Sequence, residues 1–244
     1  MITSKNNELI KTCIQLKNKK FSREANLCLV ESIKLVKELY HKGLTKHILV
    51  TEEKSDTINI FSNVKVDLIS KNVADYICDS VTTDGIFAIC NIPHYDSVSY
   101  KNCLVLDRIQ DPSNLGAIIR SACAFGFETI LTIDSVYPYS FKAIRSSMGH
   151  VFSVNMIETN IINLKQLKEK YSLKFYSADM NGDDISALKR DSNQNIAIII
   201  GNEGAGVSNE LSKLADSTIS IPMYNCVESL NASVSAGIIM YLLR

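Results

Sequence analysis

The residues Ile196-Ala197-Ile198-Ile199-Ile200 are followed at once by Gly201-Asn202-Glu203-Gly204-Ala205-Gly206. An apolar run without alternation predicts a strand that is buried on both faces, as in a parallel sheet covered by helices. The glycines that follow let the backbone turn sharply and lie against a flat ligand. Ligands of such sheets bind beyond the carboxyl ends of the strands, so this stretch predicts an α/β fold with a site at residues 201–206.

The same pattern extends over the second half of the chain. Apolar runs alternate there with segments of helical periodicity, which predicts a parallel sheet with β-α crossovers. The expected strands are residues 103–106, 129–133, 151–154, 174–178, 196–200 and 218–221. The expected helices are residues 114–125, closed by Gly126, and residues 140–147, 161–171, 208–215 and 229–243.

The first half has the pattern of a smaller α/β unit. Apolar residues at helical spacing predict a helix over residues 32–41 that ends at Gly43. Residues 92–102 contain a proline, several polar residues and no periodicity, which is typical of a linker. A further short helix is expected at residues 73–78, and strands at residues 47–51, 64–69 and 86–91. We place the boundary near Ser97, which gives domains of residues 1–96 and 97–244.

The segment after the first strand of the second half enters a helix at Pro112, which Ser113 or Asn114 can cap. Gly116 weakens this helix by about 1 kcal/mol relative to Ala, which indicates a close ligand or backbone. Arg120 lies on the same face as Gly116 in an otherwise apolar helix. Its side chain must reach a partner or water, so a functional role and a structural ion pair both remain open.

Residues 201–206 alone are consistent with a plain β-α turn, a phosphate loop or a site for another nucleotide-like ligand. A phosphate loop is disfavoured because the order is not G-x-G-x-x-G, no Lys-Ser or Lys-Thr follows, and Glu203 would repel phosphate. A nucleotide-like ligand without an anionic group fits better.

A third polar segment, residues 221–233, connects the last strand to the last helix. Small residues in that helix allow another backbone to approach closely. The alternative is an ordinary helix start capped by Ser229 or Asn231.

In their order along the chain, the three segments resemble the SpoU/TrmH group of RNA ribose 2′-O-methyltransferases in the SPOUT superfamily. The resemblance lies in N-L-G-A-I-I-R at 114–120, I-I-I-G-N-E-G-A-G at 198–206, I-P-M at 221–223 and S-L-N-A-S-V-S-A-G at 229–237. The first half resembles the family's small α/β RNA-substrate-binding domain at residues 29–39, 47–52 and 84–89, although Ser32 stands where the family usually has Gly.

The resemblance implies S-adenosylmethionine as the cofactor and a SPOUT-type parallel sheet with a deep trefoil knot, in which the last helix is threaded through a preceding loop. It also implies a homodimer. The positions that match the family's cofactor site are Gly201, Asn202, Gly204, Ile221, Met223, Leu230, Ser177 and Ala178. Those that match its catalytic site are Arg120, Asn114, Glu203, Ser229 and Asn231.

Family resemblance gives Arg120 the central catalytic role. A guanidinium stays protonated, so we expect Arg120 to hold a phosphate and to stabilise the alkoxide that forms, with Glu203 orienting it. The group that accepts the ribose proton is left open. The apolar residues 238–243 suit either a dimer interface or a buried helix.

The charge of the chain is balanced overall but not locally. The 26 Lys and Arg equal the 26 Asp and Glu, whereas residues 1–50 hold ten Lys and Arg against four Glu. If the substrate is RNA, part of this excess becomes a candidate phosphate contact; a solvated helix face is the alternative. The candidate RNA-binding residues are Lys17, Lys19, Lys20 and Arg23.

Composition excludes several classes of protein. The 46% hydrophobic content argues against a disordered chain, and the longest aliphatic run, residues 196–200, is far short of the roughly 20 residues of a membrane span. Charged residues near the start are unlike a secretory signal, so we expect a cytoplasmic protein. The seven scattered cysteines include no C-x-x-C pair, so we expect reduced, mostly buried thiols and no metal site.

The function we expect is an S-adenosylmethionine-dependent RNA 2′-O-ribose methyltransferase. By analogy with the family, the first domain favours ribosomal RNA as the substrate, with transfer RNA as the alternative. A noncatalytic RNA-binding protein on the same scaffold is a second hypothesis. An NAD-dependent enzyme is disfavoured, because no G-x-G-x-x-G follows the first strand of the second half.

Overall fold

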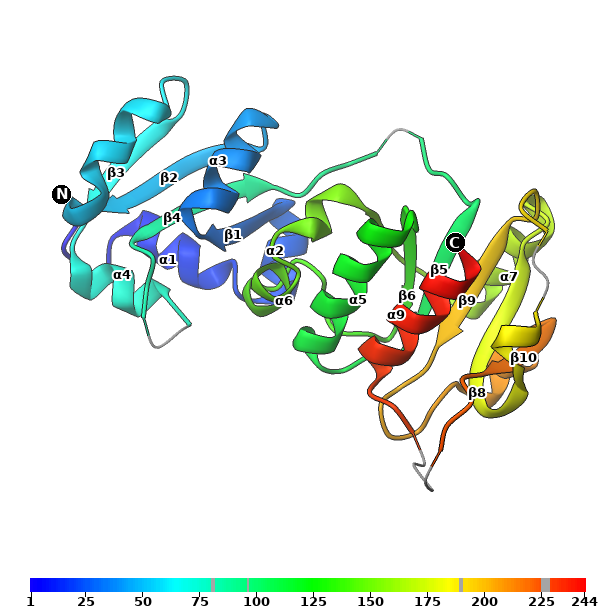
Figure 1. The fold of residues 1–244 in the computed structure, drawn as a ribbon. Coiled ribbons are helices and arrows are strands. Elements are labelled where there is room, and N and C mark those ends of the chain that lie inside the picture. The colour runs from blue at the N-terminus through cyan, green and yellow to red at the C-terminus, as the bar shows by residue number, and fades with distance from the viewer. Residues whose placement is uncertain (80–81, 96, 189–190, 225–228) are drawn as a thin grey trace. The chain divides into compact units, whose positions relative to one another are not determined.

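The computed structural model describes residues 1–79, 82–95, 97–188, 191–224 and 229–244 (Figure 1). Asn225 to Glu228 of the third polar segment, including Cys226, lie outside the described residues. The chain divides into two compact units. The first contains residues 1–94 and 139–149, and the second contains residues 95–138 and 150–244.

The first unit is built on a four-stranded sheet in the order β1-β4-β2-β3. β2 and β3 are parallel, and β4 is antiparallel to both β1 and β2. The strands are β1 (Leu27–Glu31), β2 (Thr45–Thr51), β3 (Lys65–Ile69) and β4 (Ile86–Asn91). The helices are α1 (Glu8–Gln15), α2 (Lys19–Ala25), α3 (Ile33–His41), α4 (Lys71–Ile77) and α6 (Phe141–Ser146), with a 3₁₀ helix, η1 (Glu52–Ile60).

The core of the first unit is formed by residues from distant parts of the chain. Leu29, Leu49 and Phe87 of the sheet pack in one cluster with Ile10 of α1 and Phe141 of α6. Successive side chains of a strand point to opposite faces of the sheet, so the sheet buries one layer of side chains on each face. The helix α3 packs against β1, β2 and β4. The first unit is thus completed by a helix that follows β6 in the sequence.

The predicted elements of the first half are confirmed: α3, α4, β2, β3 and β4 all form. The elements α1, α2, β1 and η1 were not predicted. Ser32 precedes α3 with a φ of 115°. This φ is positive, in the region that favours glycine, so a residue with a Cβ atom is strained at position 32.

The second unit is built on a six-stranded sheet in the order β10-β8-β9-β5-β6-β7, and every neighbouring pair is parallel. The strands are β5 (Asn102–Asp107), β6 (Thr129–Ile133), β7 (Asn155–Glu158), β8 (Lys174–Asp184), β9 (Ile196–Ile200) and β10 (Ser217–Ser220). The helices are α5 (Pro112–Phe125), α7 (Ile161–Lys170), α8 (Asn209–Ser212) and α9 (Ala232–Leu243), with 3₁₀ helices η2 (His150–Ser153) and η3 (Ile185–Ala187).

Helices cover both faces of this sheet, as the unalternating apolar strands predict. On one face α5 and α9 lie side by side, and α9 also packs on β9 (Figure 1). On the other face Val105 and Ile199 pack with Leu164 of α7 and Leu211 of α8. The α/β class and the parallel sheet predicted from the sequence are confirmed. None of the helices among the described residues is long and apolar enough to cross a membrane.

Four predicted details of the second unit are wrong. Residues 151–154 are not a strand, because Val151 and Phe152 are buried within the 3₁₀ helix η2 and the strand β7 begins at Asn155. The helix α5 is capped by Asp111, whose carboxylate accepts from the Ser113 amide at 2.8 Å, rather than by Ser113 or Asn114. The helix α9 begins at Ala232, and α8 is a single turn. Gly126 ends α5 in the left-handed conformation, as predicted.

Candidate active site

Residues 178–180 of β8 and the segments that follow β9 and β10 meet around a cavity of about 330 Å³. These three strands are neighbours in the parallel sheet, so their carboxyl ends open at the same edge. The helix α9 closes one side. The cavity is lined by Ala178, Asp179, Met180, Ile200, Gly201, Asn202, Glu203, Gly204, Ala205, Gly206, Ile219, Ser220, Ile221, Met223, Ser229, Leu230, Ala232, Ser235 and Ile239.

The structure brings the predicted cofactor residues together. Seven of the eight line the cavity: Gly201, Asn202, Gly204, Ile221, Met223, Leu230 and Ala178. The eighth, Ser177, directly precedes Ala178 in β8 and is 1% exposed. Its Oγ atom is buried and has no hydrogen-bond partner among the described residues.

The glycine loop, residues 201–206, is closed on itself. Backbone hydrogen bonds of 3.0 Å join Asn202 and Gly206 in both directions. The Oδ1 atom of Asn202 accepts from the amides of Gly204 and Ala205, each at 3.0 Å. A Cβ atom on Gly201 would lie 2.1 Å from the carbonyl carbon of Gly206. Only glycine therefore fits at position 201, because the two ends of the loop are in contact.

Three side chains from distant segments form a polar network beside the cavity. The Nδ2 atom of Asn231, before α9, donates to the Oδ1 atom of Asn114 in α5 at 3.0 Å. The Nδ2 atom of Asn114 in turn donates to the Oε1 atom of Glu203 at 2.9 Å. Asn114 is buried, and Asn231 also caps α9 by accepting from the Ser233 amide. The network fixes three of the five predicted catalytic residues relative to one another.

The carboxylate of Glu203 is kept ionised by its surroundings. Burial raises its pKa, but hydrogen bonds from Asn114 and from the backbone amides of Glu203, Asp111 and Gln110 lower it more strongly, so the pKa lies below its ordinary value. Glu203 therefore places a negative charge at the cavity at neutral pH.

The other two predicted catalytic residues are accessible. Ser229 is exposed and lines the cavity. Arg120 is exposed on α5, and among the described residues its guanidinium has no hydrogen-bond or ion-pair partner. Glu203 is bonded to Asn114, and no contact joins it to Arg120 among the described residues, so the expectation that Glu203 orients Arg120 stays a prediction. Residues six apart on a helix point about 120° away from each other, so Asn114 faces the loop while Arg120 faces solvent.

The comparisons with known proteins cover both units. A model of the SpoU rRNA Methylase family matches residues 101–241, and a model of the MRM3-like substrate binding domain matches residues 7–88. The chain belongs to the SpoU rRNA methylase family. A full-length relative of this SpoU-family protein is the 23S rRNA (guanosine(2553)-2'-O)-methyltransferase RlmP of Bacillus subtilis (strain 168). RlmP is 30% identical over 246 residues, which span 100% of this chain and 98% of RlmP.

Solved structures share the fold of the SpoU-family chain. An AdoMet-bound rRNA methyltransferase from Sinorhizobium meliloti superposes with a TM-score of 0.87 at 24% identity, over 99% of this chain and 95% of that one. An RNA 2'-O ribose methyltransferase superposes with a TM-score of 0.82 at 25% identity, over 99% and 96%. The predicted membership of the SpoU/TrmH group is therefore confirmed.

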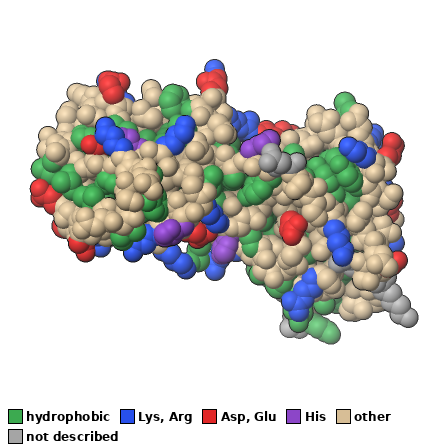
Figure 2. All heavy atoms as spheres, turned by 90° about the horizontal axis from the view of Figure 1, so that it is seen from above, with side chains coloured by type: hydrophobic (Ala, Val, Ile, Leu, Met, Phe, Trp, Pro, Cys, Tyr) green, Lys and Arg blue, Asp and Glu red, His purple; other side chains and the backbone are tan. Residues whose placement is uncertain are grey.

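The four predicted RNA-binding residues of the SpoU-family protein lie at α2 of the first unit, in two different settings. Lys17 is bound to Asp79 and lies over the ring of Phe141, so its charge is already paired. Lys19, Lys20 and Arg23 are exposed and line a shallow hollow with Asn18 and Glu24, where the Nζ atom of Lys20 lies 4.0 Å from the Oε1 atom of Glu24. In the space-filling view, Lys and Arg side chains lie among acidic and apolar ones rather than covering the whole visible face (Figure 2).

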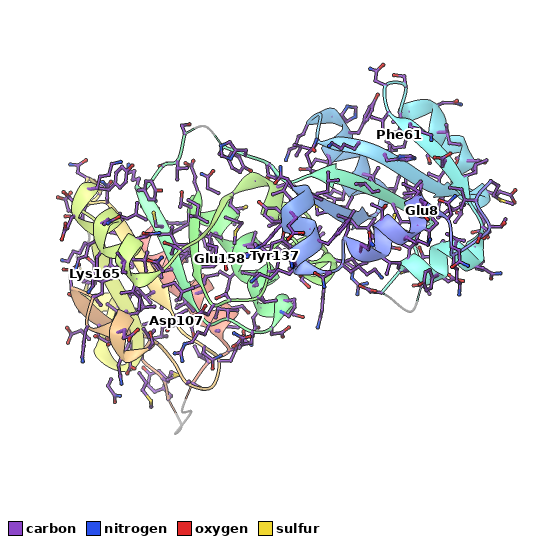
Figure 3. The ribbon with its side chains drawn as sticks, turned by 180° about the vertical axis from the view of Figure 1, so that it is seen from behind. Glu8, Phe61, Asp107, Tyr137, Glu158 and Lys165 are labelled. Carbon is purple, nitrogen blue, oxygen red and sulfur yellow. The ribbon has the colours of Figure 1, made fainter. Side chains whose placement is uncertain are left out.

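Sequence reasoning missed Asp107 and Arg108, which connect β5 to the glycine loop. Asp107 is 1% exposed and lies inside the second unit (Figure 3). Both of its carboxylate oxygens accept from the side chain of Arg108. The one signal in the sequence that could have indicated these two residues is a charged pair at the end of a predicted strand. The contact of Arg108 with the glycine loop joins residues far apart in the chain, so no sequence pattern indicates it.

The described cysteines of the SpoU-family chain are mostly buried, as expected; their reduced state stays a prediction. The six described cysteines are all free, and four of them are buried. Burial raises the pKa of Cys13, Cys90 and Cys103 to about 12, so these thiols are not nucleophiles at neutral pH. Within the described ranges no cluster of His, Cys, Asp and Glu could hold a metal ion.

Proposed function

We propose that this SpoU-family protein transfers a methyl group from S-adenosylmethionine to a ribose 2′-hydroxyl of ribosomal RNA. The observation that carries the proposal is the network of Asn231, Asn114 and Glu203 beside the cavity. Each of these residues belongs to a different family motif, and the fold places all three at one site. The full-length similarity to a 23S rRNA 2′-O-methyltransferase supports ribosomal RNA over transfer RNA.

The cavity suits the adenosine part of S-adenosylmethionine. Ile200, Ile221, Leu230 and Ile239 supply apolar walls for a flat base. The backbone groups of Gly201, Ile221 and Leu230 can donate to and accept from the edge of an adenine, which needs both. A loop without a side chain at position 201 lets the backbone approach the ligand.

The cavity also suits the charge of the cofactor. A sulfonium is positive, and the ionised Glu203 on the lining attracts it, whereas the same carboxylate repels the phosphates of a dinucleotide. When bound there, S-adenosylmethionine supplies an electrophilic methyl group.

The residues of the chain then position the ribose. Arg120 points away from Asn114 of its own chain, so its role belongs with the homodimer proposed below, in which a second copy completes the site. There its accessible guanidinium binds the neighbouring phosphate and stabilises the negative charge that develops on the ribose oxygen. Asn114 and Asn231 hold each other and Glu203 in fixed orientations, so the polar groups around the ribose need little reorganisation. Ser229 lines the cavity and is exposed, so its hydroxyl can contact the ribose.

We further propose that residues 1–96 bind the RNA substrate and that residues 97–244 carry the reaction. The match of residues 7–88 to a substrate-binding domain supports the first assignment. Exposed Lys19, Lys20 and Arg23 are the proposed phosphate contacts, and Lys17 contributes by holding the structure through Asp79. A cytoplasmic location belongs to the same proposal, since free thiols suit a reducing compartment.

A trefoil knot and a homodimer complete the proposal. β10 lies at the edge of the sheet, yet α9, which follows it, packs on α5 and β9. The described residues between β10 and α9, Ile221, Met223, Ser229 and Leu230, line the same cavity as the glycine loop, and this supports a threaded helix. Val234, Tyr241 and Leu242 on α9 are 49%, 52% and 47% exposed. Large apolar side chains on one helix support a surface covered by a second copy.

The proposed function is tested by incubating the protein with methyl-labelled S-adenosylmethionine and separate ribosomal and transfer RNA fractions that lack the modification. We expect label in ribosomal RNA, at a ribose 2′ position. The variant Arg120→Ala should lose at least about 100-fold in rate, because it removes charge stabilisation in the transition state. The control Lys165→Ala removes an exposed cation at the outer edge of the second unit (Figure 3) and should keep the rate.

Three outcomes would contradict the proposed function in different ways. Label in transfer RNA alone would refute the ribosomal substrate. Binding of S-adenosylhomocysteine without labelling of any RNA would favour a noncatalytic RNA-binding protein. A folded Arg120→Ala protein with the rate of the Lys165→Ala control would refute the role of Arg120.

A further inference from the structure

Arg108, directly after β5, has an unusual backbone conformation. Its φ of 55° lies in the left-handed region that residues with a side chain seldom adopt. Such a conformation persists only where surrounding contacts fix it, and it is enriched at functional sites. Here the amide of Arg108 donates to the carbonyl of Ile133 at 2.9 Å, and its carbonyl accepts from the Nδ2 atom of Asn202 at 2.8 Å.

The side chain of Arg108 connects a buried carboxylate to the glycine loop. Its Nε and Nη2 atoms donate to the two oxygens of Asp107 at 3.0 and 3.2 Å, and Nη2 also donates to the carbonyl oxygen of Gly206 at 3.2 Å. The Asp107 carboxylate accepts in addition from the Ser208 amide at 2.7 Å. A planar guanidinium can make all three bonds at once, whereas the single nitrogen of a lysine cannot reproduce this geometry.

These contacts hold the glycine loop at both ends. The carbonyl of Arg108 binds Asn202 at the beginning, and its side chain binds Gly206 at the end. Residues 201–206 all line the cavity, and Glu203 within them is the residue bonded to Asn114. A shift of the loop would change the shape of the cavity and the position of this carboxylate together.

We propose that Arg108 is a positioning residue that fixes the glycine loop in the shape that binds S-adenosylmethionine. The proposal rests on the proposed function for the identity of the ligand. A structural ion pair alone would explain the bonds to Asp107, but it would not require the bonds to Asn202 and Gly206.

The test compares three variants of the full chain. Arg108→Gly keeps the left-handed backbone but removes the side-chain bonds. Arg108→Lys keeps a positive charge beside Asp107 but lacks the several N–H donors of the planar guanidinium. The matched control is Ser172→Gly, since Ser172 has a φ of 49° in the same unit but lies before β8, at the end of the sheet away from the cavity.

Binding of S-adenosylhomocysteine is measured by isothermal titration calorimetry, and the Michaelis constant for S-adenosylmethionine is measured beside it. We expect Arg108→Gly to weaken binding about tenfold and to raise the Michaelis constant similarly, because the lost bonds involve a charged donor. The rate at saturating cofactor should stay within about twofold, because binding then restores the loop. Arg108→Lys should give an intermediate affinity, and Ser172→Gly should bind as the wild type does.

An affinity of Arg108→Gly within twofold of that of the Ser172→Gly control would overturn the proposal. If the wild type itself binds neither compound, the proposed function fails, and the loop is followed directly by hydrogen exchange. Protection of the Asn202 and Gly206 amides should then be lost in Arg108→Gly and kept in Ser172→Gly. Equal protection in the two variants would refute the role of Arg108 independently of any ligand.

Discussion

Replacing Ser32 by Gly should stabilise the protein. Ser32 is held at φ 115° and ψ 127°, where a Cβ atom is strained, and its side chain makes no capping hydrogen bond to α3. Relief of such strain contributes about 1–3 kcal/mol, and the extra freedom of glycine in the unfolded chain costs about 0.4–1 kcal/mol. The net expectation is a gain of about 1 kcal/mol, or roughly 3 °C in melting temperature for a chain of this size.

The assay is urea unfolding followed by circular dichroism, with two comparison variants. Ser70→Gly is the matched control, because Ser70 precedes α4 without a side-chain cap but has an ordinary φ of −73°. It should lose about 0.5–1 kcal/mol from unfolded-state entropy alone. Ser32→Ala keeps the Cβ atom and should gain nothing. A Ser32→Gly protein as destabilised as Ser70→Gly would show that position 32 carries no strain and would refute the reasoning.

Two further predictions concern the second unit. Gly201→Ala places a Cβ atom 2.1 Å from the backbone of Gly206 and should lower the free energy of unfolding by about 3 kcal/mol. In the control Gly204→Ala, the nearest atom to the new Cβ lies at 3.8 Å, so the free energy of unfolding should change by less than about 0.5 kcal/mol. Equal melting temperatures of the two variants would contradict the prediction. Burial raises the pKa of Asp216, but bonds from Lys168 and the Phe175 amide lower it below its ordinary value. The stabilisation by Asp216 is therefore present above about pH 4 and lost as pH falls through the folded pKa. Unfolding curves of the wild type and Asp216→Asn should converge at acidic pH, and a constant difference would count against the assignment.

The sequence allowed the second sheet and most of the cavity to be predicted, because both depend on local pattern. The strand 196–200 is apolar at every position, and all five residues are buried in the middle of the sheet. Asn114, Glu203 and Asn231 lie in motifs whose order matches the family, and the structure joins them by hydrogen bonds.

What could not be predicted depends on contacts between distant residues. The left-handed conformation of Arg108 is set by Asn202 and Gly206, nearly a hundred residues away, so no local spacing indicates it. Val151 and Phe152 form an apolar pair that is as compatible with a buried 3₁₀ helix as with a strand. The direction of Glu203 toward Asn114 is likewise decided by the packing of the loop on α5.

The place of α6 in the first unit affects the order in which the chain can fold during synthesis. Phe141 belongs to the same apolar cluster as Ile10, Leu29 and Phe87. When residues 1–94 have left the ribosome, that cluster still lacks its aromatic side chain from α6. The first unit therefore becomes complete only after β5, α5 and β6 have been translated, and a graft of this unit onto another enzyme must carry residues 139–149 with it.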